Sequence, residues 1–183
     1  MDAFKKISTS LPGVFVLEPR VFGDERGFFL ESYNEKALAD LGIEDRFVQD
    51  NHSRSRRNVL RGLHYQIKSP QGKLVRAVEG EILDVAVDLR RSSPTFGGSE
   101  AVRLSGENKR MLWIPKGFAH GFSVKSETAQ VLYKASDYYA PEFERTLTWN
   151  DPDLKIDWEL QGEPIISAKD QCGATLRNAE TFE

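Results

Sequence analysis

The sequence lacks several features that would point to particular classes of protein. It has one cysteine, Cys172, among 183 residues, so it can build neither an internal disulfide framework nor a cysteine-rich zinc site. No apolar run is long enough to cross a bilayer. The first residues, MDAFKKISTSLPG, lack the apolar stretch of a secretory signal. These absences predict a soluble, cytoplasmic protein without a membrane partner.

Positive charge is not in excess either. Lys and Arg total 25 against 28 Asp and Glu, which gives a formal net charge of −3. A protein whose main partner is nucleic acid is usually basic, so we expect no nucleic-acid partner. Charged residues make up 29% and hydrophobic residues 39% of the chain, a composition typical of a folded domain. The length predicts a single domain over residues 1–183.

What the sequence has in abundance is short apolar alternations between Gly, Pro and Asn turns. In residues 83–90, Leu and Val alternate with polar residues or alanine, which is the period of a half-buried strand. Further strands are predicted at 14–17, 28–33, 73–78, 101–104, 111–114, 118–124 and 130–135. Many short strands at this spacing indicate an antiparallel sandwich or barrel. One helix is predicted at 35–41, with Asn34 as N-cap and Gly42 just past its end.

Other segments are less regular. Residues 155–157 and 165–167 are candidates for short edge strands. The densest positive cluster, Arg54, Arg56 and Arg57, is predicted to lie in a solvated loop, and a role near an anionic ligand is the alternative.

The candidate chemistry begins with the histidines His52, His64 and His120. Residues 115–120, PKGFAH, fit the Pro-x-Gly-x-x-His pattern of cupin barrels, in which a turn leads into a strand whose histidine points inward. Metal-binding cupins carry His-x-His on an earlier strand, whereas this sequence has Gln66 in place of the second histidine. The pattern therefore favours His64 as a free base and His120 as a polar ligand.

A metal site would need further ligands. Zinc and iron sites usually have at least three protein ligands with His, Cys or carboxylate donors. His64 and His120 supply two, and only Glu79 or Glu81 suggests itself as a third. We therefore expect no metal.

Cationic residues flank His64. Arg61, Lys73, Arg26 and Lys169 together predict an electropositive mouth for a phosphorylated ligand, held by side chains because no Gly-rich phosphate loop is present. In a regular strand, Arg61 and His64 would face opposite sides, because an odd number of positions separates them. They can share a site only if a bulge intervenes, and Gly62 is a suitable position for one.

Two more residues have both a structural and a chemical interpretation. Tyr133 lies among alternating apolar residues, so it is either a core tyrosine or an acid that delivers its phenol proton inside the barrel. Asp170 is a loop carboxylate that gains a role only if it folds back to orient the imidazole of His64.

These segments resemble the dTDP-4-dehydrorhamnose 3,5-epimerases, a rhamnose-pathway family with a metal-free cupin barrel. The resemblance runs from about residue 13 to residue 170. It is carried by the segments DERGFF at 24–29, QDNHS at 49–53, LRGLHYQ at 60–66, QGKLV at 71–75, DVAVD at 84–88, SPTFG at 93–97, LWIP at 112–115, GFAHGF at 117–122, YK at 133–134, WNDP at 149–152 and KD at 169–170.

The resemblance implies a fold, a site and an assembly. The fold is an all-β, cupin-type antiparallel barrel (jelly roll) with a few short helices. His64 would be the base, paired with Asp170, and Tyr133 the acid. Tyr139 would stack near the nucleotide base, and the implied substrate contacts are Arg26, Glu31, Gln49, Asn51, Arg61, Lys73, His120, Glu144 and Lys169. The family is a homodimer that exchanges N-terminal strands, so Arg26 and Glu31 would serve the partner's site.

The implied reaction inverts C3 and C5 of dTDP-4-dehydro-6-deoxy-D-glucose to give dTDP-4-dehydro-L-rhamnose, without a cofactor. The 4-keto group acidifies the hydrogens on both carbons, so a base can form an enolate and an acid can return the proton to the opposite face. Lys73 near O4 would stabilise the enolate. Two alternatives remain open: an epimerase that inverts only C3 or only C5, and a non-catalytic or metal-dependent cupin binder.

Overall fold

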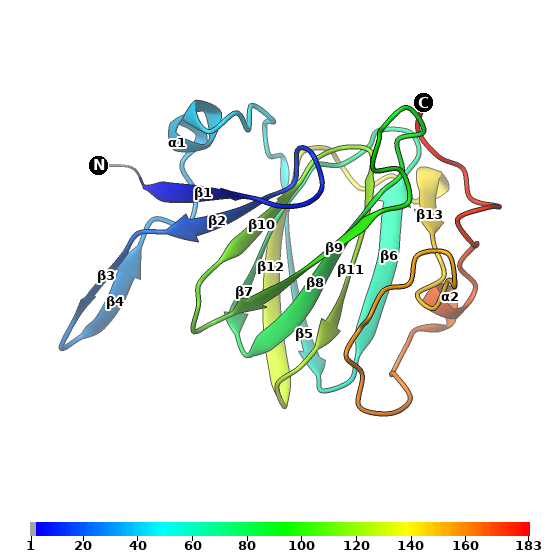
Figure 1. Cartoon of the computed structure of the whole chain (residues 1–183). Helices are drawn as coiled ribbons and strands as arrows, with labels where there is room; N and C mark the ends of the chain where they lie inside the picture. The colour runs from blue at the N-terminus through cyan, green and yellow to red at the C-terminus, as the bar shows by residue number, and fades with distance from the viewer. Residues whose placement is uncertain (1–2) are drawn as a thin grey trace.

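The computed structural model describes residues 3–183 and contains two antiparallel sheets that face each other (Figure 1). The larger sheet has the strand order β1, β2, β10, β7, β12, β5, and the smaller has the order β13, β6, β11, β8, β9. The apolar core between them contains Val75 and Val131 from the larger sheet, and Ile82 and Phe118 from the smaller. The expected all-β class is confirmed, although the two sheets remain separate instead of closing into one barrel.

The elements have the following bounds. The larger sheet consists of β1 (Phe4–Ser8), β2 (Phe15–Pro19), β5 (Gln49–Arg56), β7 (Lys73–Glu79), β10 (Met111–Ile114) and β12 (Thr128–Ala135). The smaller sheet consists of β6 (Leu60–Gln66), β8 (Glu81–Asp88), β9 (Ser99–Ser105), β11 (Phe118–Val124) and β13 (Glu144–Thr146). The remaining elements are the hairpin β3 (Val21–Asp24) and β4 (Gly27–Leu30), the helices α1 (Glu35–Asp40) and α2 (Ala168–Gln171), and the 3-10 turn η1 (Pro141–Phe143).

Helix α1 forms where the sequence predicts it. The Asn34 side chain accepts a hydrogen bond from the Ala37 N–H at 3.0 Å, and Gly42 follows the helix with a φ of +86°. Leu38 is buried against the outer face of the larger sheet, in a cluster with Trp113. The helix therefore covers the part of that face formed by β2, β10 and β7.

The strand predictions had mixed outcomes. The bounds of β10 and β11 match those predicted, but the strand expected at 28–33 ends at Leu30. Arg54 and Arg56 lie on the exposed side of β5, so the prediction of a loop there was wrong. Neither 155–157 nor 165–167 forms a strand, and Ile165 makes only a single bridge to Val59.

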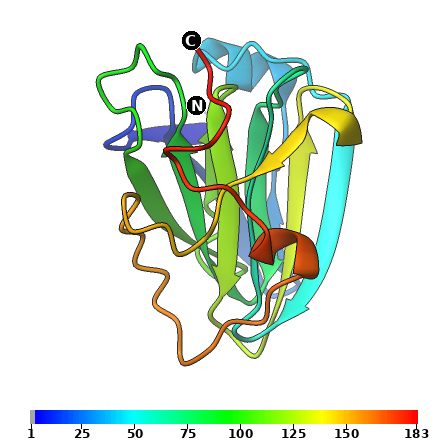
Figure 2. The same ribbon diagram turned by 90° about the vertical axis from the view of Figure 1, so that its right-hand side faces the viewer.

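Strand β8 is buried on both faces, so the expectation of a half-buried strand was wrong. Leu83 and Val85 pack outward against Leu154 and Trp158 of the C-terminal segment, which Figure 2 shows lying over the smaller sheet. The opposite face of β8 looks between the sheets and carries the fully buried Asp84. The irregular C-terminal segment thus supplies the cover that the alternating pattern does not reveal.

A bulge at Gly62 changes the register of β6. His64 pairs with His120 and Arg61 pairs with Phe122, so three steps on β6 oppose two on β11. Gly62 has a φ of +111°, and a Cβ there would lie 2.6 Å from both the Gly121 Cα and the His120 carbonyl oxygen. Only glycine fits this close approach. The expected bulge is confirmed, and it lets Arg61 and His64 share one site.

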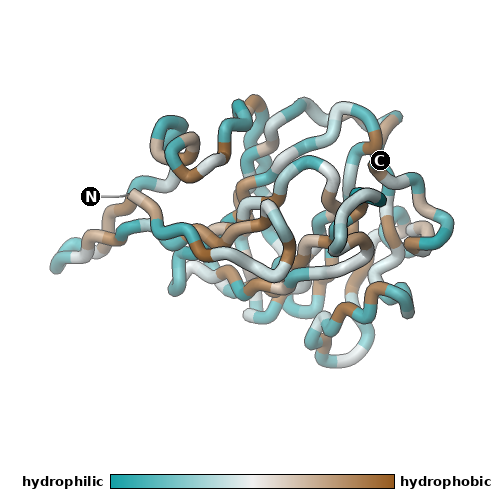
Figure 3. Tube along the Cα trace, turned by 45° about the horizontal axis from the view of Figure 1, so that its top comes forward, coloured by the Kyte–Doolittle hydropathy of each residue, from teal (hydrophilic) through white to brown (hydrophobic). Residues whose placement is uncertain are grey.

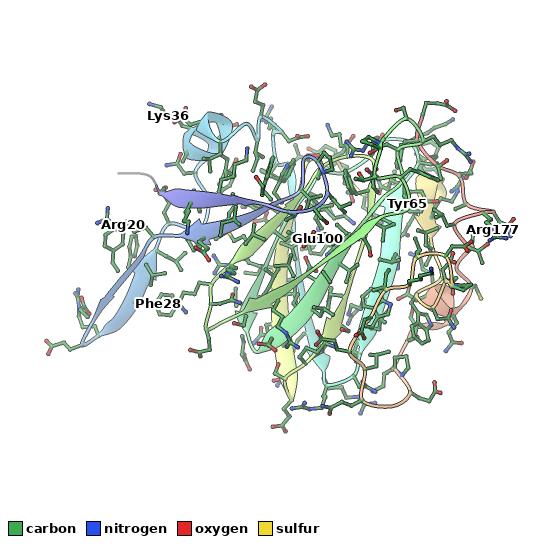
Figure 4. All side chains as sticks on the ribbon, viewed as in Figure 1. Arg20, Phe28, Lys36, Tyr65, Glu100 and Arg177 are labelled. Atoms are coloured by element: carbon green, nitrogen blue, oxygen red, sulfur yellow. The ribbon has the colours of Figure 1, made fainter. Side chains whose placement is uncertain are left out.

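The hairpin formed by β3 and β4 projects away from the two sheets (Figure 1). Its aromatic side chains Phe22, Phe28 and Phe29 are 50%, 61% and 71% exposed. Figure 3 shows hydrophobic stretches on this arm, and Figure 4 places Phe28 on the opposite side of the molecule from Arg177. Within residues 3–183, no helix is long and apolar enough to span a membrane.

We expect Gly62→Ala to destabilise the fold. The added methyl group meets backbone atoms at 2.6 Å in a conformation that disfavours alanine, so the free energy of unfolding should fall by more than about 2 kcal/mol. Gly162→Ala is the matched control, since Gly162 has a φ of +87° and open space around the added Cβ. Urea unfolding of both variants makes the comparison. Equal losses would mean that the contact with β11 is unimportant.

Candidate active site

Polar side chains gather between the two sheets, in the rows that elsewhere form the apolar core. On β7, Lys73 lies on the same side as Val75, and on β12, Tyr133 lies on the same side as Val131. On β11, the buried His120 lies between the inward-facing Phe118 and Phe122. The strand period that builds the core therefore also aims these polar groups inward.

His64 lies opposite the larger sheet and hydrogen-bonds to a buried carboxylate. Its Nε2 is 2.5 Å from the Asp170 Oδ1. Asp170 lies in the short helix α2, where Ser167 caps the Asp170 N–H at 3.1 Å, and the Gly62 N–H donates to its Oδ2 at 3.4 Å. The pairing expected between His64 and Asp170 is present in the structure.

The ionised state of the Asp170 carboxylate fixes the tautomer of His64. Burial alone would raise the pKa of Asp170, but the hydrogen bond and charge of His64, with further bonds from Gly62 and Ser167, hold it below its ordinary value. The carboxylate is therefore ionised at neutral pH and only accepts hydrogen bonds. His64 must donate from Nε2, which leaves Nδ1 as the nitrogen that can take a proton.

Lys73 is a buried ammonium between the sheets. Burial lowers the pKa of Lys73 to about 8, against the opposing effects of the nearby carboxylates Asp84 and Glu144. Its Nζ is 3.5 Å from the His64 carbonyl oxygen and 6.0 Å from the centre of the Tyr133 ring. A buried cation in this position can stabilise negative charge that develops on a bound molecule.

Tyr133 faces the site from the larger sheet. Burial, helped by the charge of Glu144, raises the pKa of Tyr133, while Arg61 acts in the opposite direction. Its ring meets the His120 ring edge-on, with 6.4 Å between the centroids. The phenol therefore keeps its proton at neutral pH and can donate it.

Arg61 crosses the space between the sheets. Its Nε donates to the Ser55 hydroxyl at 3.0 Å, and Ser55 lies on β5 of the opposite sheet. Gln49 and Asn51 extend the same inward row of β5, and the Gln49 side-chain amide donates to the Asn51 Oδ1 at 3.0 Å. The Asn51 Nδ2 is buried and has no hydrogen-bond partner among residues 3–183, so it is a donor available to a ligand.

Glu144 connects two residues that the sequence separates widely. Its Oε2 accepts a hydrogen bond from the Tyr139 hydroxyl at 2.6 Å and forms an ion pair with Lys169. Burial would raise the pKa of Glu144, but its bonds to Lys169 and Tyr139 hold it below the ordinary value. The exposed Tyr139 and Lys169 are therefore fixed beside the buried groups.

The sequence analysis gave no role in the site to Asp84, and it noted Gln66 only as the residue in place of a second histidine. Asp84 accepts a hydrogen bond from the His120 Nε2 at 2.7 Å. Gln66 accepts from the Ala140 N–H at 2.9 Å and donates to the Ser69 and Tyr138 carbonyl oxygens at 2.7 and 3.2 Å. The available signal was the strand alternation, which places Gln66 on the same side of its strand as His64. For Asp84 the alternation was misleading, because without knowledge of the cover on β8 its polar side is expected to face solvent.

Arg26 and Glu31 lie outside this site in the single chain. Arg26, in the turn of the projecting hairpin, pairs with Asp24. Glu31 lines a separate cavity of about 460 Å³ between the hairpin and α1, together with Arg20 and Lys36. The other expected substrate contacts surround the space between the sheets or its edge.

The described residues contain no set of side chains arranged to bind a metal ion. No group of three or more His, Cys, Asp or Glu side chains in the described part of the chain could hold a metal ion. The two glutamates considered from the sequence have other partners, since Glu79 bonds to Gln130 and Glu81 pairs with Arg103.

Known proteins resemble this chain over nearly its whole length. A family model described as dTDP-4-dehydrorhamnose 3,5-epimerase matches residues 8–178. The chain is 60% identical over 179 residues to the dTDP-4-dehydrorhamnose 3,5-epimerase of Pseudomonas aeruginosa, covering 97% of this chain and 99% of that protein.

Solved structures agree with the sequence likeness. A dTDP-6-deoxy-D-glucose-3,5-epimerase from Legionella pneumophila, in complex with dTDP-4-keto-L-rhamnose, has a TM-score of 0.95 and 52% identity, covering 97% of this chain and 95% of that one. A 3′-monoepimerase from Streptomyces bikiniensis, in complex with dTDP-quinovose, has a TM-score of 0.88 and 33% identity, covering 93% and 87%.

We expect Gln66→Leu to destabilise the protein and loosen residues 138–140. The leucine leaves the Ala140 N–H and two carbonyl oxygens without their partners, which should lower the free energy of unfolding by about 1–3 kcal/mol. The control is Gln130→Leu, whose side-chain bonds to His52 and Glu79 lie at the surface and whose cost should stay near ~0.5 kcal/mol. Thermal unfolding measures the stability of both variants, and the rate of proteolysis at residues 138–140 measures how far this segment is loosened. A Gln66→Leu protein as stable as the control would contradict this account.

Proposed function

The chain belongs to the dTDP-4-dehydrorhamnose 3,5-epimerase family, and we propose that His64 and Tyr133 carry out its proton transfers. The protein is an isomerase. It inverts C3 and C5 of dTDP-4-dehydro-6-deoxy-D-glucose and forms dTDP-4-dehydro-L-rhamnose, a step of dTDP-L-rhamnose biosynthesis. The observation that carries the assignment of roles is the placement of the two residues on opposing sheets.

The base acts from the smaller sheet. Asp170 holds the Nε2–H of His64, so Nδ1 removes the proton from the carbon beside the 4-keto group. The electron pair moves onto O4 and forms an enolate. The ammonium of Lys73 lies between the sheets, where it stabilises this charge without reorganisation of solvent.

The acid acts from the larger sheet. A sugar ring bound between the sheets presents one face to His64 on β6 and the other to Tyr133 on β12. The phenol returns a proton to the face opposite the one that lost it, so the configuration inverts. This chemistry needs neither a metal nor a redox cofactor, because base, acid and charge stabilisation all come from side chains.

Cationic and aromatic groups at the edge of the site suit the nucleotide. Arg61 and Lys169 supply positive charge for the diphosphate. Tyr139 is exposed, and its hydroxyl is anchored on Glu144, so its ring can stack on the thymine base. Asn51, with its free amide group, is placed to donate to the sugar beside Tyr133.

A narrower reaction is the competing function. The 33% identical relative from Streptomyces bikiniensis is a 3′-monoepimerase of similar fold, so the fold alone does not fix the number of inverted centres. The 60% and 52% identical relatives described above are 3,5-epimerases, which favours inversion at both carbons. Proton NMR of the product separates the two.

The assembly we propose is a homodimer that exchanges N-terminal strands. In support, the hairpin carries exposed phenylalanines away from its own body, and Arg26 at its tip is remote from its own site. A second copy would cover this apolar surface and receive Arg26 and Glu31 beside its own Arg61. The location we propose is cytoplasmic, because a charged dTDP-sugar does not cross a bilayer unaided.

Exchange with deuterated water tests the two proton-transfer roles. His64→Ala should abolish both epimerisation and deuterium entry at C3 and C5, a loss of about 10²–10⁴-fold. Tyr133→Phe keeps the ring but lacks the proton, so the enolate forms and His64 quenches it on the original face. Deuterium should then enter recovered substrate while product falls steeply, as seen by NMR and mass spectrometry. Epimerisation by Tyr133→Phe at the wild-type rate would mean that Tyr133 is a core residue.

Calorimetry with dTDP tests the phosphate contact. Arg61→Ala removes a charge-assisted hydrogen-bond donor, worth about 1.5–3 kcal/mol, so dTDP should bind about 10–100-fold more weakly. Arg54→Ala, on the exposed side of β5 in the opposite sheet, is the control and should bind dTDP normally. Equal affinity of the Arg61→Ala and wild-type proteins for dTDP would exclude Arg61 as a phosphate ligand.

Mixed dimers test the strand exchange. Arg26→Ala and His64→Ala chains should each be inactive alone. Co-expressed with different tags, they should form heterodimers in which one of the two sites is complete, so heterodimers purified through both tags should recover about half of wild-type activity. If Arg26 served its own chain, every site would lack one residue and the mixture would stay inactive.

A further inference from the structure

Asp84 is a buried carboxylate for which the proton transfers described above have no use. It lies on the inward side of β8 and is fully buried. One oxygen, Oδ1, accepts from the His120 Nε2 at 2.7 Å, while Oδ2 is buried and has no hydrogen-bond partner in residues 3–183. A buried carboxylate oxygen without a partner costs stability, so this arrangement calls for an explanation.

The group that can compensate Asp84 is Lys73. Burial strips the Lys73 ammonium of water, and the only hydrogen bond from its Nζ within the described residues is the 3.5 Å contact with the His64 carbonyl oxygen. Among the negative charges that act on Lys73, Asp84 has the largest effect and Glu144 the next. Asp84 therefore opposes the loss of the Lys73 proton. The titratable groups that face Lys73 from the surrounding strands are Asp84, Glu144, His64, His120 and Tyr133.

Asp84 also determines which ring nitrogen of His120 carries the proton. Burial lowers the pKa of His120, although the charge of Asp84 opposes this, so the ring is neutral near pH 7. A neutral ring that donates from Nε2 to Asp84 leaves Nδ1 as an acceptor. Glu144 cannot replace Asp84 here, because its carboxylate is engaged with Tyr139 and Lys169 at the edge of the site.

We propose that Asp84 is a positioning residue, which orients the His120 ring through its hydrogen bond and supports the Lys73 ammonium through its buried charge, for the charge that forms on O4 between the sheets. The proposal rests on the proposed function, since it concerns the same enolate. The role of Asp84 in this proposal is indirect, through Lys73 and His120. It acts by keeping Lys73 protonated during turnover and by fixing the His120 tautomer.

The test is Asp84→Asn, which keeps the shape of the side chain and removes its charge. In protein labelled with 15N at lysine Nζ, Lys73 should titrate near 8 in the wild type and lower in the variant. The alkaline limb of kcat/KM, where Lys73 loses its proton, should move down by about one pH unit. Affinity for dTDP should be unchanged. A Lys73 titration and an alkaline limb that both stay in place would overturn the proposal.

Asp88→Asn is the matched control. Asp88 is equally buried on the same side of β8, but its carboxylate bonds to Arg90, Ser93 and Thr95. It should lower the melting temperature without moving the Lys73 titration. A shift in both variants would indicate general loosening and contradict a specific role for Asp84.

The Asp84→Asn protein can fail to fold, and the wild type can fail to epimerise the sugar. If Asp84→Asn does not fold, the wild-type resonance still decides, because a Lys73 that is a neutral amine at pH 7 overturns the proposal. Failure of the proposed function looks different. In that case the wild type would not epimerise the sugar, while the Lys73 titration would still respond to Asp84→Asn.

Discussion

The hydrogen bond between the His64 Nε2 and the Asp170 Oδ1 joins the interior of the molecule to its C-terminal cover. Asp170 reaches His64 from a short helix in the segment that also buries Trp158 against the smaller sheet. The base therefore depends on packing more than 100 residues away in sequence. Gly62, whose N–H also bonds Asp170, ties the bulge to the same carboxylate. One contact thus links the register of β6, the cover and the tautomer of the base.

The second constraint is the burial of charge between two sheets. The same alternating rows hold Val75 and Val131 in the core and Lys73 and Tyr133 in the site, so the site is the polar continuation of the core. Charges in such a place are costly unless they are paired, and here Asp84 pairs with the buried His120 and its charge also acts on the buried Lys73. Desolvation lowers the pKa of Lys73 to about 8 and raises that of Tyr133, so the two pKa values lie further apart than those of the free side chains.

The helix cap, two of the strands and the bulge could be predicted from the sequence, because each depends on residues close together in the chain. Asn34 caps α1, the strand bounds at 111–114 and 118–124 follow the apolar period, and the parity conflict between Arg61 and His64 located the bulge. Sequence reasoning missed what depends on distant segments. The strand that carries Asp84 was predicted to be half-buried, because the cover on β8 comes from irregular chain some 70 residues later, whose sequence shows no regular period. The residues alone left a structural and a chemical interpretation for both Asp170 and Tyr133, and the family resemblance favoured the chemical one.

The state of the His64 ring tests the central claim most directly. Nitrogen NMR of protein labelled at histidine distinguishes a protonated Nε2 from a protonated Nδ1, without turnover or substitution. We predict that the neutral ring of His64 carries its proton on Nε2, hydrogen-bonded to Asp170, and that Nδ1 is then free to accept a proton. A neutral ring that carries its proton on Nδ1 would contradict this prediction.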